Sequence, residues 1–273
     1  MHSSIRAWAS AVTTFVATVS AATTSVPVTP HASYSSSIGV LGCKVNTNRI
    51  AYWPMAVDCN NICVSLSYEG RQVYLLRIDQ SGGAHDVSYD AWNYLITGKS
   101  ATADPTAGGA IQMDTENVDA SKCAGLINTS GSKLPLSAAN SMNFLNSCLE
   151  KQADGNDSWV ASNYVLYNIL DPICTYGYNE VCTLRDWPDQ NQATCPNTLG
   201  DPVSLTSQPV YNIEYPTGKK VLAGSSASSS SGATPNTIVA ASSGGCTNMF
   251  TCQPLLFLAF GLCAVLQSFF ISL

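Results

Sequence analysis

The cysteines constrain most tightly what this chain can fold into. Eleven cysteines occur in 273 residues, and three of them, Cys246, Cys252 and Cys263, lie near the C-terminus. The other eight are Cys43, Cys59, Cys63, Cys123, Cys148, Cys174, Cys182 and Cys195. An even set in an oxidising compartment predicts four disulfides, with the pairing left open by the sequence. We expect no metal site, because Cys59 and Cys63 lack a second pair at zinc-finger spacing and the chain has only three histidines.

The N-terminal residues indicate where these cysteines are oxidised. Arg6 precedes a weakly apolar run that ends in the small residues Ser20, Ala21 and Ala22. This pattern is typical of a secretory signal peptide and is too short for a membrane span. We therefore expect residues 1–21 to be removed on secretion.

The C-terminal residues predict a lipid anchor. Residues 254–273 are apolar and carry no charge, residues 246–253 form a polar spacer, and small residues precede the spacer. This order predicts a glycosylphosphatidylinositol (GPI) anchor attached at Ser243, with Ser242 and Gly244 as alternative sites. Removal of residues 244–273 would leave the even set of eight cysteines. We expect the protein on the outer face of the plasma membrane or in the cell wall, with a tail-anchored helix as the alternative.

Composition limits the partners that we expect. Charged residues make up 11% of the chain, the net charge is −6 and the isoelectric point is about 4.9. These values argue against nucleic acid and anionic lipid as ligands. Residues 223–243 are rich in Ser, Ala, Thr and Gly and predict a stalk, which leaves residues 31–217 as the folded domain. Asn128 and Asn156 begin N-glycosylation sequons.

Hydrophobic patterning predicts strands in the first half of this domain and helices between them. A first strand covers residues 49–53, and residues 63–68 and 72–79 form a hairpin that turns at Glu69 and Gly70. Ser88 and Gly98 mark the two ends of a short helix, and another strand follows Gly109. In the second half we expect a helix capped by Ser137 and a β run over residues 159–169.

The order of these elements resembles the double-psi β-barrel shared by barwin, expansins, kiwellins and a group of small endoglucanases. The resemblance covers residues 43–123, from the strand at 49–53 through the hairpin and the segment His85-Asp86-Val87-Ser88 to the strand after Gly109. It implies a mainly β fold: a six-stranded double-psi barrel with short helices, followed by a disulfide-rich C-terminal extension.

The same resemblance implies a site. In such barrels the aspartate that corresponds to Asp86 faces a polysaccharide groove, and Tyr52, Trp53, Asp79 and His85 are the candidate residues beside it. Tyr52 and Trp53 are adjacent in a strand, so only one of them can face the groove. Asp86 has a second interpretation, because an acidic residue just before Ser88 can help to cap the helix.

Hydrolysis requires a second carboxylate, and the related endoglucanases place it after the aromatic pair of the first strand. Here that position is Pro54, and Asp58 is the remote substitute. We therefore expect a fungal surface protein that binds or loosens glucan, chitin or cellulose without ordinary hydrolysis and without a cofactor. Two alternatives remain open: a barrel that binds another surface protein, and a weak glycoside hydrolase that uses Asp86 with a different base.

Overall fold

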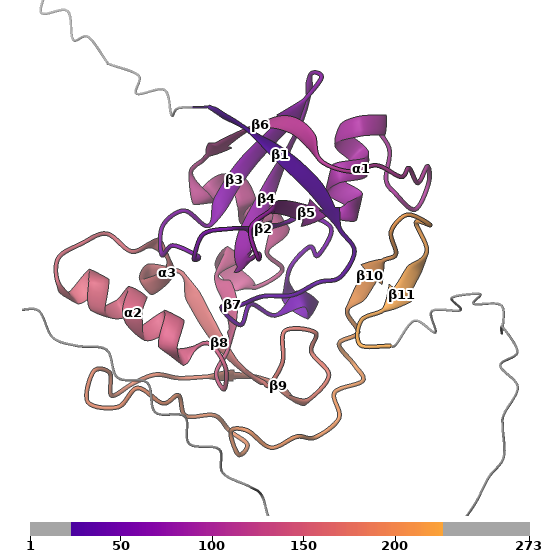
Figure 1. Cartoon of the computed structure of the whole chain (residues 1–273). Coiled ribbons are helices and arrows are strands. Elements are labelled where there is room, and N and C mark those ends of the chain that lie inside the picture. The colour runs from indigo at the N-terminus through magenta and orange to yellow at the C-terminus, as the bar shows by residue number, and fades with distance from the viewer. Residues whose placement is uncertain (1–22, 226–273) are drawn as a thin grey trace, which may run out of the picture. The chain divides into compact units, whose positions relative to one another are not determined.

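The computed structural model describes residues 23–225, and its main feature is a closed six-stranded barrel (Figure 1). The strands follow one another around the barrel in the order β1-β5-β2-β4-β3-β6. Their bounds are Thr24–His31 (β1), Ile50–Trp53 (β2), Cys63–Tyr68 (β3), Arg71–Gln80 (β4), His85–Ser88 (β5) and Ile111–Asn117 (β6). The pairs β1–β5 and β2–β4 are parallel and the other pairs are antiparallel. The predicted fold class is therefore confirmed.

The barrel begins earlier in the chain than the sequence indicated. We expected the folded domain to start at residue 31 and the first barrel strand at residue 49, but β1 covers Thr24–His31 and pairs with both β5 and β6. Pro27 and Pro30 lack the N–H groups that a central strand normally donates, so local propensity argues against a strand here. Tertiary pairing overrides that propensity, since Val28 is completely buried inside the barrel.

The hairpin and the first helix form where the sequence placed them. β3 and β4 pair in one register from Cys63 opposite Leu76 to Tyr68 opposite Arg71. Glu69 and Gly70 form the turn with positive φ angles of 46° and 78°, as tight hairpins require. Helix α1 covers Tyr89–Thr97 and ends at Gly98, whose φ is 77°.

Ser88 occupies the N-cap position of α1, but its side chain does not cap the helix. Its hydroxyl accepts a hydrogen bond from the Ile50 backbone N–H and donates one to the Thr47 carbonyl. Ser88 therefore links β5 to the loop before β2.

The extension forms a smaller mixed sheet of three strands, β7 (Leu134–Ser137), β8 (Tyr164–Ile169) and β9 (Gly177–Cys182). β7 and β8 are parallel, and β8 and β9 are antiparallel. The predicted cap at Ser137 is wrong: Ser137 ends β7, and helix α2 covers Met142–Ala153 after the N-cap Ser141. The predicted β run over residues 159–169 is wrong in its first part. There the Ser158 hydroxyl accepts from the Ala161 N–H and starts the short helix α3, Trp159–Ser162.

The remaining elements are a two-stranded sheet near the C-terminal end of the described residues and three short 3₁₀ helices earlier in the chain. The strands β10 (Tyr211–Ile213) and β11 (Lys220–Leu222) pair with each other, and the following Ala223 is buried. The 3₁₀ helices are η1 (Gly42–Lys44), η2 (Ala120–Leu126) and η3 (Ser130–Ser132). The stalk that we predicted from residue 223 therefore starts in ordered structure, and most of it lies outside the described residues, as do the signal peptide and Ser243.

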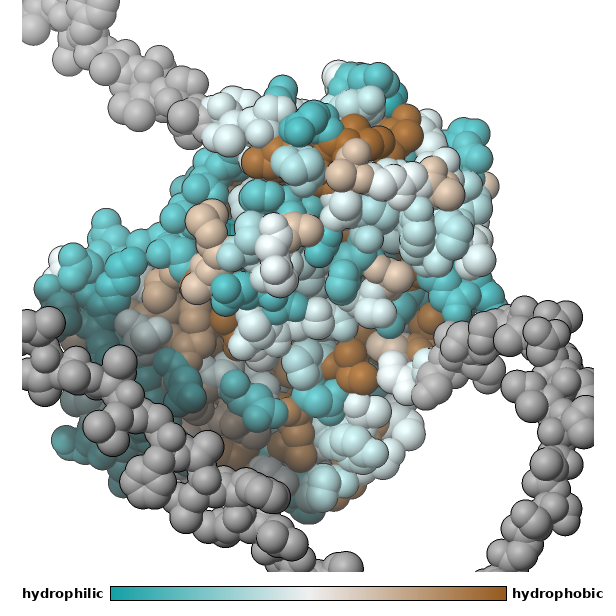
Figure 2. Space-filling view, in the orientation of Figure 1, coloured by the Kyte–Doolittle hydropathy of each residue, from teal (hydrophilic) through white to brown (hydrophobic). Residues whose placement is uncertain are grey.

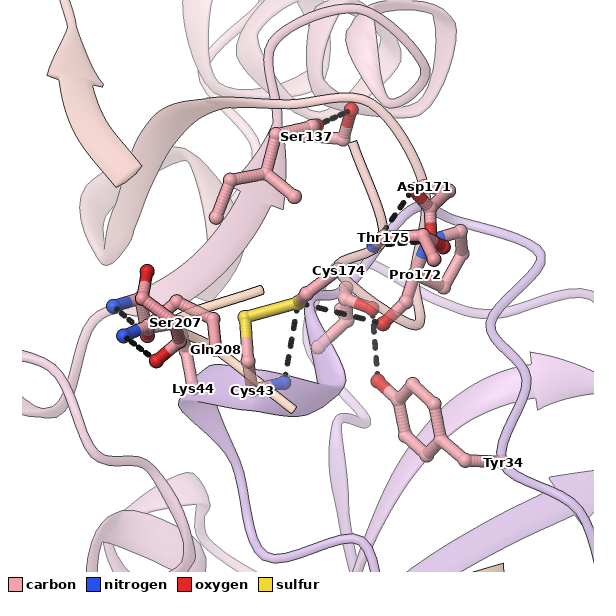
Figure 3. Close-up of a disulfide and its surroundings, with 12 residues drawn as sticks. Tyr34, Cys43, Lys44, Ser137, Asp171, Pro172, Cys174, Thr175, Ser207 and Gln208 are labelled. Atoms are coloured by element: carbon pink, nitrogen blue, oxygen red, sulfur yellow. Dashed lines mark hydrogen bonds between the residues drawn. A yellow bond between two sulfur atoms is a disulfide. The ribbon is translucent and has the colours of Figure 1, made fainter. Parts of the chain in front are cut away.

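All eight predicted cysteines form disulfides. The pairs are Cys43–Cys174, Cys59–Cys148, Cys63–Cys123 and Cys182–Cys195. Figure 3 shows the first pair, which joins η1 to the loop after β8 close to Tyr34. Two of the pairs thus connect the barrel half of the chain to the extension.

Two apolar clusters follow from the alternation of side chains along the barrel strands. One fills the barrel interior and includes Val28, Leu66, Leu75 and Trp92. The other lies between the outside of the barrel and the extension, where residues such as Ile50, Tyr52 and Ile78 share a cluster with Leu136, Leu145 and Leu166. The extension therefore completes a core that the barrel strands begin.

The face of the described residues that Figure 2 shows is mostly polar: it is largely teal or pale, with brown patches of limited extent. Within residues 23–225, no helix is long and apolar enough to span a bilayer, and no group of three or more His, Cys, Asp or Glu side chains is placed to hold a metal.

Candidate functional site

The candidate residues lie on neighbouring strands, but on two different faces. β1, β5 and β2 are adjacent in the barrel, and successive side chains of each strand point to opposite sides. Tyr52 and Asp86 are direct partners across β2 and β5 and lie on the outer face, whereas Trp53 and His85 line a cavity at the barrel mouth. The structure therefore divides the predicted set into two groups.

Asp86 is held in place by the strand beside it. Thr29 of β1 is its register partner, and the Thr29 hydroxyl donates a hydrogen bond to the Asp86 carboxylate. The carboxylate is half-buried on the outer face of the barrel. Its observed partner lies across the sheet, and no hydrogen bond joins it to the first turn of α1. The hydrogen bond from Thr29 to Asp86 therefore stabilises the pairing of β1 with β5.

Tyr52 and His31 place two rings beside this carboxylate. Tyr52 is 3% exposed, and its ring centroid lies 4.4 Å from that of His31. Burial raises the pKa of the Tyr52 hydroxyl, and the charges of Asp79 and Asp86 raise it further. Tyr52 is therefore a neutral hydroxyl at physiological pH, and of the two rings only His31 has substantial exposure.

Asp79 serves the loop that follows β1. Its carboxylate accepts hydrogen bonds from the Ser35 hydroxyl at 2.5 Å, the Ser37 N–H at 2.7 Å and the Gln80 N–H at 2.8 Å. The side chain is buried, and these three donors occupy both oxygens. Asp79 therefore positions residues 35–37.

The second group lies at the mouth of the barrel. The Trp53 and His85 rings meet edge to face at 5.3 Å, and the Arg77 guanidinium carbon lies 5.6 Å from the Trp53 ring centroid. Burial and the nearby Arg77 charge lower the pKa of His85, although Asp86 opposes them. At neutral pH His85 is consequently uncharged.

A polar groove begins at the outer-face group. His31, Tyr52 and Ser88 line a small cleft of about 10 Å³, which is room for one water molecule. The cleft shares Thr47, Asn48, Tyr211 and Ile213 with an adjoining groove of about 410 Å³. The groove thus lies between the loop before β2 and the β10–β11 hairpin of the extension.

The groove lining is hydroxyl-rich and contains no carboxylate. Its polar side chains are Thr47, Asn48, Ser100, Thr102, Tyr211 and Lys220. Tyr211 is 40% exposed, and the Lys220 ammonium lies 4.2 Å from its ring centroid. Such a surface can hydrogen-bond neutral hydroxyl groups and stack against a ring, but it lacks the pair of carboxylates that ordinary glycoside hydrolysis uses.

Residues 11–126 match the cerato-platanin family model. This family consists of fungal surface and cell-wall proteins with an expansin-like barrel, so the match confirms that part of the resemblance, while the barwin and kiwellin parts are not confirmed. The matched range covers less than half of the chain and ends before β7. The groove therefore combines residues of the cerato-platanin-like region with residues of the extension.

Other comparisons add little. Cerato-platanin 3 from M. perniciosa is a structural neighbour at 16% sequence identity, covering 37% of this chain and 98% of its own, with a TM-score of 0.28. No curated protein matches the chain.

The predicted position of a second carboxylate is Pro54, which directly follows the last residue of β2. Residues 32–57 contain no Asp or Glu, so no carboxylate follows β1 or β2 before Asp58. Asp58 accepts hydrogen bonds from the N–H groups of Asn60 and Asn61 and forms a turn outside the groove lining.

Sequence reasoning missed Thr29, His31 and the groove residues of the extension. The alternation of Val26 and Val28 with polar neighbours is a signal that could have found β1, had the prolines not masked it. Arg77 was also missed, although a charged residue inside the apolar run Leu75-Leu76-Arg77-Ile78 indicates a buried polar function. No comparable signal marks Tyr211 or Lys220.

Proposed function

We propose that this protein binds a neutral wall polysaccharide along the outer face of its barrel without hydrolysing it. The observation that carries the proposal is the groove of about 410 Å³, whose lining offers hydroxyl, amide and tyrosine groups and no carboxylate. Neutral sugars present hydroxyl groups and apolar ring faces, which match that lining. The cerato-platanin match of the barrel supports a wall ligand.

The bound chain would continue from the groove toward Asp86. His31 lines the small cleft next to the groove, and Thr29 lies two residues earlier on the same face of β1, about 7 Å away. Thr29 and Asp86 thus extend the polar track beyond the cleft. In this proposal Tyr211 stacks on one sugar ring, and Asp86 accepts a hydroxyl hydrogen bond from another.

Retention of the protein on insoluble chitin, β-glucan and cellulose tests the proposal. Tyr211→Ala and Asp86→Ala should each reduce retention about tenfold, because each removes a direct contact. Tyr176→Ala and Asp114→Ala are matched controls: Tyr176 is 48% exposed, Asp114 is exposed on β6, and neither lines the track. Equal retention of all four variants, or no retention of the folded parent, would overturn the proposal.

Hydrolysis is tested on the same polymers. We expect no release of reducing sugar by the parent protein. Release that is abolished by Asp86→Asn would instead support the alternative of a weak glycoside hydrolase.

A protein-binding role is the second candidate, and one observation favours it. Val181 and Val203 are large apolar residues of the extension with substantial exposure, and they lie outside the track. If the barrel is only a scaffold, Val181→Asp should abolish capture of a surface protein while Asp86→Ala leaves it intact.

We also propose that a GPI lipid attached at Ser243 holds the domain at the cell surface. The support is the sequence order of small residues, polar spacer and apolar tail. Phosphatidylinositol-specific phospholipase C should release the protein from intact cells. Retention at the surface after treatment, with a known anchored protein released in parallel, would contradict the anchor.

A further inference from the structure

The mouth of the barrel contains a cavity that the proposed track does not use. It has a volume of about 180 Å³ and lies where β1 begins and β6 ends, since Thr24 pairs with Thr115 there. Trp53, Arg77 and His85 form part of its wall, and the exposed Met55 stands at its edge. The cavity is therefore built from five separate segments of the barrel half of the chain.

Two buried N–H groups of this wall have no hydrogen-bond partner among the described residues. They are Nε1 of Trp53 and Nε of Arg77, whose side chains belong to residues only 5% and 4% exposed. The Arg77 side chain donates one hydrogen bond, from Nη2 to the Ala56 carbonyl at 2.8 Å. Buried donors in folded proteins are nearly always paired, so two unpaired donors behind one cavity wall indicate an acceptor that binds there. Both nitrogen atoms are closed off from the cavity, so a ligand would reach them only through a shift of the wall side chains.

The charge of Arg77 indicates which acceptor would fit. Within residues 23–225 no carboxylate lies within ion-pair distance of Arg77, and the charge of Asp58 opposes, from further away, the lowering of the Arg77 pKa by burial. A buried cation is stabilised by an anion, and the planar guanidinium group matches the two oxygens of a carboxylate. Glu116 also lines the cavity without pairing with Arg77, and its charge would oppose a bound anion.

The rest of the lining suits a sugar that carries the carboxylate. Thr24 and Asn117 offer a hydroxyl and an amide group, while Met55 and the His85 ring offer apolar surface. We propose that this cavity binds the carboxylate of a uronic acid unit in an acidic polysaccharide. The carboxylate accepts from Arg77 and the Trp53 indole, and the sugar ring rests against His85 and Met55.

This site is independent of the neutral track. Its residues lie at the barrel mouth, and none of them lines the groove or the small cleft. One chain can therefore hold a neutral polymer on its outer face and an acidic one at the mouth. Glu116→Gln should alter only the second activity, which separates a failure of this proposal from a failure of the proposed function.

Calorimetric titration of the secreted full chain with methyl α-galacturonoside tests the proposal. The uncharged methyl ester and acetate are the comparison ligands. We expect the acid to bind in the range of about 1–10 mM, at least about tenfold more tightly than either comparison ligand. Equal binding of the ester would overturn carboxylate recognition, and equal binding of acetate would overturn the assignment to a sugar.

Substitutions of residues in the cavity wall test whether the acid binds in this cavity. Arg77→Gln should abolish binding, Trp53→Phe should weaken it about tenfold through loss of one N–H donor, and Glu116→Gln should strengthen it about fivefold. Glu69→Gln, which removes an exposed carboxylate of the β3–β4 turn, is the control and should change nothing. Arg77→Gln removes a buried group and can unfold the barrel, so the decisive pair is Trp53→Phe and Glu116→Gln. Unchanged affinity in both would place any uronate binding elsewhere and overturn the proposal.

Discussion

The barrel and the extension are held together in different ways. Six strands close the barrel into a continuous hydrogen-bonded ring around an apolar interior. The extension has one three-stranded sheet and long irregular segments, yet three of the four disulfides involve its cysteines. The contrast shows that a closed sheet can rely on pairing and burial, whereas a loop-rich segment of similar length needs covalent links.

Removing the extension is the strongest way to test this contrast. A chain that ends at residue 133, with Cys43→Ala and Cys59→Ala to avoid free thiols, should lose its cooperative fold. The reason is that Ile50, Tyr52 and Ile78 would lose the apolar residues that cover them. Near-ultraviolet circular dichroism measures the effect, with a chain ending at residue 225 as the folded control. A cooperative thermal transition in the shorter chain would show that the barrel is self-sufficient.

The loss of stability on removing one disulfide should increase with the length of the loop that it closes. Cys43→Ala with Cys174→Ala opens a link that spans 131 residues and should lower the free energy of unfolding by about 4–5 kcal/mol. Cys182→Ala with Cys195→Ala opens a span of 13 residues and should cost about 3 kcal/mol. Urea denaturation of both variants gives the two values. A larger loss on removing Cys182–Cys195 would mean that this short-range disulfide stabilises the protein more than the link between the extension and the barrel does.

A buried carboxylate should matter more in the barrel than an exposed one. Asp90 accepts hydrogen bonds from Arg49 at 2.8 Å, the Ser100 hydroxyl at 2.5 Å and the Ala101 N–H at 2.8 Å. Asp90→Ala leaves these donors unpaired and should cost about 3 kcal/mol. Asp104→Ala removes only an exposed pair with Lys99 and should cost about 0.5 kcal/mol. Thermal denaturation that ranks the two variants equally would contradict the role of burial.

The smallest expected effect is a pH dependence at the barrel mouth. The pKa of His85 is lowered in the folded state by burial and by Arg77, whereas it is about 6.5 in an unfolded chain. The unfolded state therefore binds the proton more readily, and the free energy of unfolding should fall as pH drops below about 6.5 toward the lowered value. His85→Gln should flatten this part of the profile in urea titrations between pH 5 and pH 8. An unchanged slope would assign the dependence to another group.

The parts of the fold that sequence predicted well are those decided locally. The hairpin turn at Glu69 and Gly70 requires positive φ angles, and Gly98 ends α1 for the same reason. The eight cysteines follow from counting. By contrast, β1 depends on pairing with β5 and β6, which lie far along the chain, and its prolines conceal it. Ser137 resembles a helix cap but is committed to β7 by its pairing with Tyr167.

The candidate site was predicted in part for a similar reason. Asp86, Tyr52 and His85 were found because a short segment resembles known barrels, and the structure brings them to adjacent strands. Their division between two faces depends on strand alternation, which the sequence indicated only for Tyr52 and Trp53. Tyr211 could not be found, because the hairpin that carries it lies far along the chain from the loop before β2 with which it lines the groove.

The position of β11 has a mechanical consequence. β11 comprises only three residues, Lys220–Leu222, which pair with β10 alone, and the described chain ends three residues later. A pulling force applied at Ser225 would therefore load this short pair before it reached any barrel strand, and would peel β11 from β10 one hydrogen bond at a time. Lys220 and Tyr211 are diagonal neighbours across that pair, at the groove wall. Tension on the C-terminal side of the domain would thus loosen the groove while the barrel stays closed.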